Sequence, residues 1–209
     1  MKILLATSNH GKVKEIKEFL KDYQIYAFGD ILEPFEIEEN GTTFQQNAII
    51  KSKAVFDELK KQGLDDEFIT LSDDSGISIQ ALNWRPGVFS ARYSDDGSLS
   101  NRDEIGAKNR QKVIYELHEM GLNQSYAFYT ACMAITSKFG TFNAHGFMHG
   151  KVIDTEKGDH GFGYDYMFIP NGFDKTTSEL DPSIKAQISH RVHALKLISY
   201  IIKNLSKIY

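Results

Sequence analysis

The sequence has very little cysteine, and this limits how the chain can be stabilised. Cys132 is its one cysteine among 209 residues, so no disulfide can form within the chain. It lies in the apolar run AFYTACMAI, where we expect a small buried side chain and not a nucleophile. The sequence also lacks repeats, low-complexity tracts and linkers. A chain of this length can bury a sufficient hydrophobic core without disulfides or a structural metal.

Long apolar runs and an excess of positive charge are also missing. No stretch approaches the roughly 18 apolar residues of a membrane-spanning helix, and the start MKILLATSNHGK lacks the apolar core of a signal peptide. We therefore expect a cytoplasmic protein. With 24 Lys and Arg against 28 Asp and Glu, the formal charge of -4 argues against binding to polymeric nucleic acid. A few local cations could still bind a small anionic ligand.

Several catalytic motifs are absent. The sequence contains no Gly-x-Ser-x-Gly, His-Glu-x-x-His or Cys-x-x-Cys, and no Gly-x-Gly-x-x-Gly follows its first apolar run. His145 and His149 share one face if their segment is a strand, but two histidines without a third ligand make a poor zinc site. We expect a structural or surface role for both.

Hydrophobic residues make up 41% of the chain and charged residues 25%, which is ordinary globular composition. Apolar runs and amphipathic segments alternate, and this mixture favours an α/β fold with a mixed sheet and flanking helices. We expect one domain over residues 1–209. The expected strands are 3–6, 24–28, 68–71, 77–82, 126–136, 142–148 and 167–169, and the expected helices are 12–20, 43–59, 102–120 and a final one from about residue 190.

The opening segment reads as strand, polar loop and helix. This order places Thr7, Asn9 and the backbone amides near a helix N-terminus, which attracts anions, and Lys12 adds a positive charge. The segment is not a Walker A loop, because Ala6 replaces its first glycine and Val13 stands where Ser or Thr would bind magnesium. It could bind phosphate, although a polar turn with a solvated lysine would look the same.

Carboxylates recur in two polar segments. Asp73 and Asp74 lie in the break Ser72-Asp73-Asp74-Ser75-Gly76 between two apolar runs, and Glu38 and Glu39 lie in another loop. Three of these carboxylates could meet at one edge of the sheet. Such a cluster suits magnesium, which prefers a few carboxylates, several waters and phosphate oxygens. Asp-Asp-Ser-Gly is by itself also an ordinary turn sequence.

Two C-terminal segments could recognise a nucleobase. Gly161-Phe162-Gly163-Tyr164-Asp165 offers an aromatic face beside glycines, and its carboxylate can accept a hydrogen bond from a ring N–H. Lys185 and the run Ser189-His190-Arg191 supply donors for a phosphate or a purine 6-oxo group. A glycine-flanked core strand and a solvated helix cap are the alternatives.

Five motifs in order resemble the inosine triphosphate pyrophosphatase family, also called the Ham1-like family, from residue 2 to about residue 200. Any one of them alone would be weak, but together they are specific. They are Thr7-Ser8-Asn9-x-x-Lys12, Ser72-Asp73-Asp74-Ser75-Gly76, Pro86-Gly87-Val88-Phe89-Ser90-Ala91-Arg92-Tyr93, Gly161-Phe162-Gly163-Tyr164-Asp165 and Ser189-His190-Arg191-x-x-Ala194-Leu195.

The resemblance implies an elongated fold with two lobes around a central nucleotide cleft, a homodimer and a need for Mg2+. It also implies hydrolysis of non-standard purine triphosphates such as ITP, dITP, XTP and dXTP to the monophosphate and pyrophosphate, which keeps deaminated purines out of DNA and RNA. Asp74 would be the general base and, with Glu39, a metal ligand. The residues implied to bind substrate are Thr7, Ser8, Asn9, His10, Gly11, Lys12, Lys51, Ser75, Phe162, Gly163, Tyr164, Asp165, Lys185, His190 and Arg191.

Departures from the family pattern are few. Ser8 stands where members often carry glycine, and Tyr166 stands where many carry proline. Glu39 is chosen over Glu38 as metal ligand only because its spacing to Lys51 fits the family pattern better. Two rival functions remain open: a pyrophosphatase for modified pyrimidine nucleotides, and a nucleotide-binding module without catalytic activity.

Overall fold

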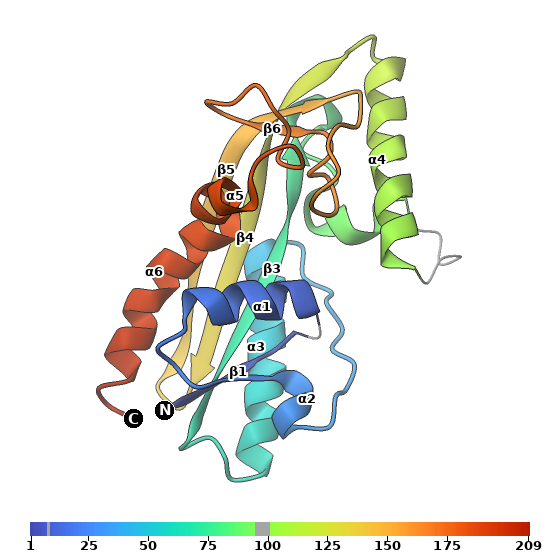
Figure 1. Cartoon of the computed structure of the whole chain (residues 1–209). Coiled ribbons are helices and arrows are strands. Elements are labelled where there is room, and N and C mark those ends of the chain that lie inside the picture. Colours follow the sequence, from blue (N-terminus) through green and yellow to red (C-terminus); the bar gives the residue numbers. More distant parts are fainter. Residues whose placement is uncertain (8, 95–100) are drawn as a thin grey trace. The chain divides into compact units, whose positions relative to one another are not determined.

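The computed structural model describes residues 1–7, 9–94 and 101–209, and Figure 1 shows the chain coloured along its length. Six strands form one sheet in the order β2-β1-β3-β4-β5-β6, with parallel pairs at β1 and an antiparallel pair between β5 and β6. The predicted α/β fold with a mixed sheet is therefore confirmed. The strands are β1 (Lys2–Leu5), β2 (Ile25–Ala27), β3 (Phe68–Ile79), β4 (Gln124–Ser137), β5 (Gly140–Ile153) and β6 (Phe168–Pro170). The helices are α1 (His10–Phe19), α2 (Phe28–Ile31), α3 (Phe44–Lys61), α4 (Arg102–Glu119), α5 (Pro182–Ile188) and α6 (His190–Leu205), with 3-10 turns η1 (Gln80–Leu82) and η2 (Gly87–Arg92).

The chain forms two compact units. The first contains Met1–Asp74, Ala131–Gly146 and Arg191–Tyr209, and the second contains Ser75–Thr130 and Phe147–His190. The long strands β3, β4 and β5 each begin in one unit and end in the other.

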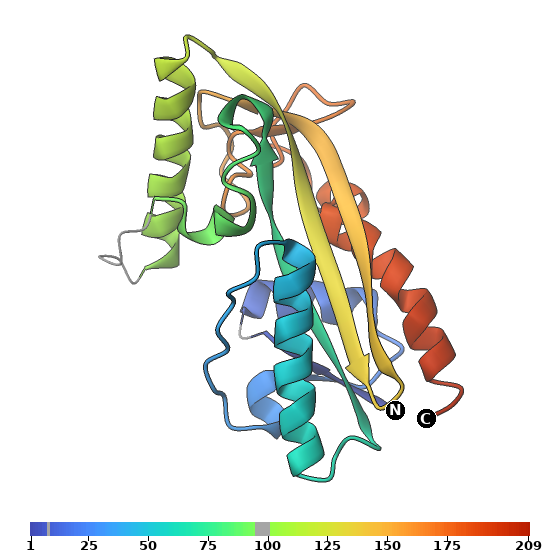
Figure 2. The same cartoon turned by 180° about the vertical axis from the view of Figure 1, so that it is seen from behind.

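The first unit has helices on both faces of its strands. β1 lies between β2 and β3 and is parallel to both. Because side chains alternate along a strand, Ile3 packs with Ile16 of α1 and Ile198 of α6, whereas Leu4 packs with Leu59 of α3 on the other face. Figures 1 and 2 show α1 and α3 on opposite sides of this part of the sheet. Cys132 is fully buried here, as predicted from the sequence.

The second unit has its own core between α4 and the strands. Val113 and Leu117 of α4 pack with Ile77 of β3, Ala127 of β4 and Phe168 of β6. The short strand β6 closes this part of the sheet by pairing antiparallel with β5. Each unit therefore has a packed hydrophobic core of its own.

The predicted break at residues 72–76 is wrong, because β3 runs without interruption from Phe68 to Ile79. Polar residues are tolerated in this strand because they find partners across it. Ser72 Oγ donates to the Ala48 carbonyl of α3 at 2.6 Å, and Asp73 forms an ion pair with Lys12. These tertiary contacts override the turn preference of the sequence Asp-Asp-Ser-Gly.

Other differences concern short elements and ends. The hairpin strands β4 and β5 are longer than predicted, and α2 and α5 had not been predicted. α5 has a recognisable start, because Asp181 Oδ1 accepts from Ser183 N at 2.8 Å and Pro182 occupies its first turn. The final helix begins at His190, as expected.

Candidate active site

The loop after β1 is organised around Asn9, the N-cap of α1. Asn9 Oδ1 accepts from the amides of Gly11 and Lys12 at 3.0 and 3.2 Å, and the Asn9 amide donates to Thr7 Oγ1 at 3.2 Å. The predicted strand, loop and helix are thus confirmed. Ser8 and the side chain of His10 lie outside the described residues. The capping bonds show that Asn9 fixes the loop that presents Lys12.

Asp73 is the centre of one ion-pair cluster in the first unit. Its carboxylate is buried and lies 2.6 Å from Lys12 Nζ and 3.4 Å from Arg191 Nη2. Arg191 Nη1 also lies 2.6 Å from Glu15 Oε2, a partner that the sequence analysis did not single out. Burial opposes ionisation, but Lys12 and Arg191 outweigh it and lower the pKa of Asp73. Asp73 therefore stays charged and ties α1 and α6 to β3.

Asp74 belongs to a second cluster, because adjacent residues of a strand point to opposite faces. Its Oδ1 lies 3.1 Å from Lys51 Nζ, and the same ammonium lies 2.7 Å from Glu39 Oε2. Glu39 rather than Glu38 is the glutamate that this lysine contacts. The expectation that Asp73 joins Asp74 and a glutamate in one cluster of carboxylates is wrong, because Asp73 is paired with cations on the other face.

In this second cluster, burial and the neighbouring charges both shift the pKa values of Asp74 and Lys51. Burial raises the pKa of Asp74, Lys51 opposes the rise and Glu39 adds to it. For Lys51, burial lowers the pKa, but the carboxylates of Asp74 and Glu39 outweigh it, and the net pKa is raised. Asp74 Oδ2 is buried and has no hydrogen-bond partner among the residues that the structure describes. A buried carboxylate oxygen without a hydrogen-bond partner destabilises the folded protein unless a ligand supplies that partner.

The donor set fits a hard divalent cation. Among the described residues no group of three or more His, Cys, Asp or Glu could hold a metal ion. Asp74 and Glu39 nevertheless offer two carboxylates joined by one lysine, and Asp74 Oδ2 lacks a partner within the described part of the chain. Mg2+ usually takes one or two carboxylates and completes its shell with water and phosphate oxygens. These two side chains are the ones that could hold it.

The second unit contains the segment 161–165, which forms a tight turn instead of a strand. Asp165 Oδ2 accepts from Phe162 N at 2.9 Å and lies 2.5 Å from Lys185 Nζ. Gly161 has φ of 105°, and a Cβ there would lie 2.6 Å from Asp165 Oδ2, so only glycine fits. Phe162 is 56% exposed, and Lys185 Nζ lies 5.0 Å from its ring centroid. The turn thus presents an open aromatic face beside an ammonium.

His190 is held by an aromatic residue that the sequence analysis missed. Its ring stacks on Tyr129 with a centroid distance of 4.7 Å and an angle of 11°, and Phe168 packs edge-on against Tyr129. No pattern in the sequence marks Tyr129, which looks like any aromatic residue of a buried strand. Although His190 and Arg191 are neighbours in sequence, they serve different units: His190 contacts Tyr129 of the second, whereas Arg191 contacts Asp73 of the first.

The predicted residues therefore form three groups. Lys12, Asp73 and Arg191 form one cluster, Glu39, Lys51 and Asp74 form another, and Phe162, Asp165 and Lys185 form the third. The Tyr164 hydroxyl, buried beside the third group, donates to the Ser90 carbonyl at 2.9 Å, so this residue fastens the turn. Ser75 follows Asp74 on β3.

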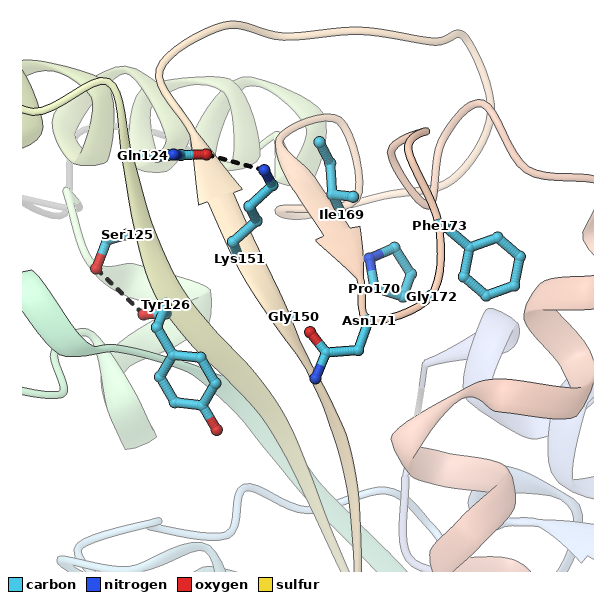
Figure 3. Close-up of a pocket in the computed structure, with 10 residues that line it drawn as sticks. All are labelled: Gln124, Ser125, Tyr126, Gly150, Lys151, Ile169, Pro170, Asn171, Gly172 and Phe173. Carbon is cyan, nitrogen blue, oxygen red and sulfur yellow. Dashed lines mark hydrogen bonds between the residues drawn. The ribbon is translucent and has the colours of Figure 1, made fainter.

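An open pocket of about 500 Å3 lies elsewhere in the second unit, where β4, β5 and β6 meet the segment 171–173 (Figure 3). Lys151 Nζ donates to Gln124 Oε1 across it at 2.9 Å. Of the described residues that line it, none is a site residue expected from the sequence. The pocket therefore shares no lining residue with the ion-pair clusters of Asp73 and Asp74.

Known proteins resemble this chain over nearly its whole length. Residues 3–200 match the model of the Ham1 family. The chain belongs to the Ham1 family. A Campylobacter concisus protein called dITP/XTP pyrophosphatase is 57% identical, with 99% of each chain covered, and its Campylobacter fetus counterpart is 54% identical over the whole of both chains. The structure of the Staphylococcus aureus Ham1 protein superposes with a TM-score of 0.83 at 30% identity, covering 98% of this chain and 99% of the other. Within the described parts of the chain, no helix is long and apolar enough to span a membrane.

Proposed function

We propose that this Ham1 family protein hydrolyses non-standard purine nucleoside triphosphates, namely the deaminated nucleotides ITP, dITP, XTP and dXTP, to the monophosphate and pyrophosphate. The observation that carries the proposal is the cluster of Asp74, Lys51 and Glu39, in which one buried carboxylate oxygen has no partner in residues 1–7, 9–94 and 101–209. The full-length relatives called dITP/XTP pyrophosphatases support the substrate class. By removing such nucleotides, the enzyme keeps deaminated purines out of DNA and RNA.

The roles of the residues follow from their environments. Glu39 and Asp74 would hold Mg2+, which offsets the negative charge of a triphosphate and polarises its phosphorus centre. Asp74 accepts the proton of the attacking water. Lys51 and Lys12 supply positive charge for the pyrophosphate that leaves. Thr7, Asn9 and the Gly11 amide form the loop that places Lys12.

Base recognition belongs to the second unit. The purine stacks on the exposed ring of Phe162, with Asp165 accepting from a ring N–H and Lys185 or His190 donating to the 6-oxo group. Adenine presents an amino donor at that position and would leave the donor of the site unpaired, so ATP is a poor substrate. We give Arg191 a supporting role, because it is 3% exposed and its guanidinium contacts Asp73 and Glu15.

We further propose that the protein acts in the cytoplasm as a homodimer. The absence of a membrane-spanning helix among the described residues is compatible with this location. Sedimentation equilibrium of the purified protein across a concentration series tests the assembly.

The decisive experiment measures pyrophosphate and orthophosphate released from ITP, dITP, XTP, GTP, ATP and dCTP, with magnesium and with a chelator. We expect pyrophosphate from the first three substrates and loss of turnover with chelator. Asp74→Asn should lower kcat by at least roughly a hundredfold, since general bases contribute about 100 to 10,000-fold, and should leave the melting temperature within a few degrees of wild type. Turnover of dCTP alone would favour a pyrimidine enzyme. Binding of ITP without turnover would favour a catalytically silent nucleotide-binding module.

A further inference from the structure

Arg110 of α4 makes three contacts with the segment that surrounds Phe162. Its Nη1 donates to the Gly163 carbonyl at 2.9 Å, its Nε lies 2.8 Å from Glu156 Oε2, and its guanidinium lies 4.5 Å from the centroid of the Tyr166 ring. The side chain is only 11% exposed. All of these residues belong to the second unit. None of these contacts is part of the cluster of Asp74, Lys51 and Glu39.

Tyr166 links the same arginine to the other end of the turn. Its hydroxyl donates to the Gly161 carbonyl at 3.3 Å, a long and therefore weak hydrogen bond, and its carbonyl accepts from Lys157 N at 2.8 Å. Together, Arg110 and Tyr166 contact the carbonyls of the two glycines that flank Phe162. The direct bond from Arg110 is the shorter and charge-assisted one, so it contributes more.

Asp165 holds the Phe162 amide from within the turn, whereas Arg110 and Tyr166 hold the carbonyls of the two flanking glycines. Gly161 and Gly163 have φ of 105° and 60°, and a Cβ at Gly163 would meet nothing within 4 Å. Glycines lose more conformational freedom on ordering than any other residue. Phe162 is 56% exposed, so packing does not fix its ring. The orientation of the ring therefore depends on the backbone on either side of it.

We propose that Arg110 is a positioning residue for base recognition, which acts by fixing the Gly163 carbonyl and with it the plane of the Phe162 ring. This inference rests on the proposed function, in which Phe162 stacks on the purine. The planar guanidinium of arginine suits this positioning role, since it can donate to a carbonyl, contact a carboxylate and lie over an aromatic ring at the same time. A lysine could make only part of these contacts.

Steady-state kinetics with ITP test the inference on four variants of the full chain. Arg110→Ala should raise KM roughly tenfold while kcat changes less than about threefold, because Asp74 and its partners are untouched. Arg110→Lys, which retains the charge, should give an intermediate KM and covers the case in which the alanine variant does not fold. Phe162→Ala should raise KM at least as much. Lys108→Ala, which removes an exposed cation from the same helix, is the matched control and should match wild type.

The double variant Arg110→Ala with Phe162→Ala separates positioning from a general effect on structure. If Arg110 acts through Phe162, the double variant has the KM of Phe162→Ala alone. Without the Phe162 ring, the loss of Arg110 has no further effect on base recognition. The inference would be overturned if the fold-increases in KM of the two single variants multiplied in the double variant, or if KM were unchanged in both arginine variants. Either result would leave the proposed function intact. A wild-type protein that neither binds nor hydrolyses ITP would overturn both.

Discussion

At the scale of single residues, Asp73 and Asp74 are neighbours in sequence with opposite surroundings. Asp73 is paired with Lys12 and Arg191 and has a lowered pKa, whereas Asp74 shares one lysine with Glu39 and has a raised pKa. A lowered pKa stabilises the folded state at neutral pH, and a raised pKa of an acid opposes folding there. We infer that the first aspartate is retained for structure and the second for chemistry.

The structural role of Asp73 can be measured by acid denaturation. Its folded pKa lies below the unfolded value of about 3.9, so its contribution to stability is present above that pH and is lost as the pH falls through the folded pKa. Asp73→Asn should lower the free energy of unfolding at pH 7 by roughly 3 kcal/mol, because the buried Arg191 and the partly buried Lys12 lose a charged partner. It should also weaken the pH dependence below about pH 4. Urea titrations at several pH values measure both effects.

Asp66→Asn is the control, because that carboxylate is 81% exposed in its pair with Lys138. Exposed pairs contribute about 1 kcal/mol or less, so this variant should follow wild type closely. If Asp73→Asn and Asp66→Asn had the same stability at every pH, the structural role of Asp73 would be refuted.

Residue-level prediction from the sequence had a clear limit. Asn9 followed by Gly11 and Lys12 marked the start of a helix, since side-chain capping is a local interaction, and the structure confirms it. Glu39 was singled out only because its spacing to Lys51 resembles that of the family, and in the structure its carboxylate lies 2.7 Å from Lys51 Nζ. Glu15, Tyr129 and Arg110 escaped notice, because their roles depend on partners far away in the chain, up to 176 residues for Glu15. No local pattern encodes such contacts.

At the scale of elements, long periodic segments were predicted well and β3 was not. α3, α4 and α6 agree closely with the expected helices, since each has an apolar stripe and a definite start or end. Residues 72–76 of β3 consist of turn-forming types, and tertiary partners such as Ala48, Lys12 and Lys51 make them compatible with a strand. Turn preference is a local property, whereas burial of a charged strand residue is decided by the rest of the fold.

The pairing of β5 with β6 provides a test at this scale. A Cβ at Gly150 would lie 2.2 Å from the Ile169 carbonyl oxygen and 2.8 Å from Phe168 Cζ. Gly150→Ala should therefore push β6 away and cost about 1 to 3 kcal/mol of stability. Gly106→Ala in α4 is the control, because its Cβ would make only an ordinary contact at 3.5 Å. It should be neutral or slightly stabilising. Thermal denaturation of the two variants compares them, and equal melting temperatures would contradict the clash.

At the scale of the whole molecule, each unit contains one unique side chain that can report on its unfolding. Cys132 is the single cysteine and is buried in the first unit, where burial raises the pKa of its thiol to about 12. Trp84 is the single tryptophan, lies in the second unit and contacts Tyr126 and Phe128. Thiol labelling therefore reports on one unit and tryptophan emission on the other.

We expect the two probes to report the same urea midpoint. β3, β4 and β5 each supply strand residues to both cores, so neither core can lose its sheet without disturbing the other. Pulse labelling of Cys132 and emission of Trp84 are measured on the same samples. Cys132→Ala and Trp84→Phe show that each signal comes from its intended residue. Separate midpoints would mean that the units unfold independently.

The arrangement of β3 also has an evolutionary consequence. Because Asp73 and Asp74 use opposite faces of one strand, the number of residues between Phe68 and Asp74 decides which carboxylate meets which lysine. Replacing a side chain there alters one contact, whereas inserting or deleting a single codon would exchange the two faces at once. Lineages descended from this gene should therefore accumulate substitutions in this stretch while its length stays fixed.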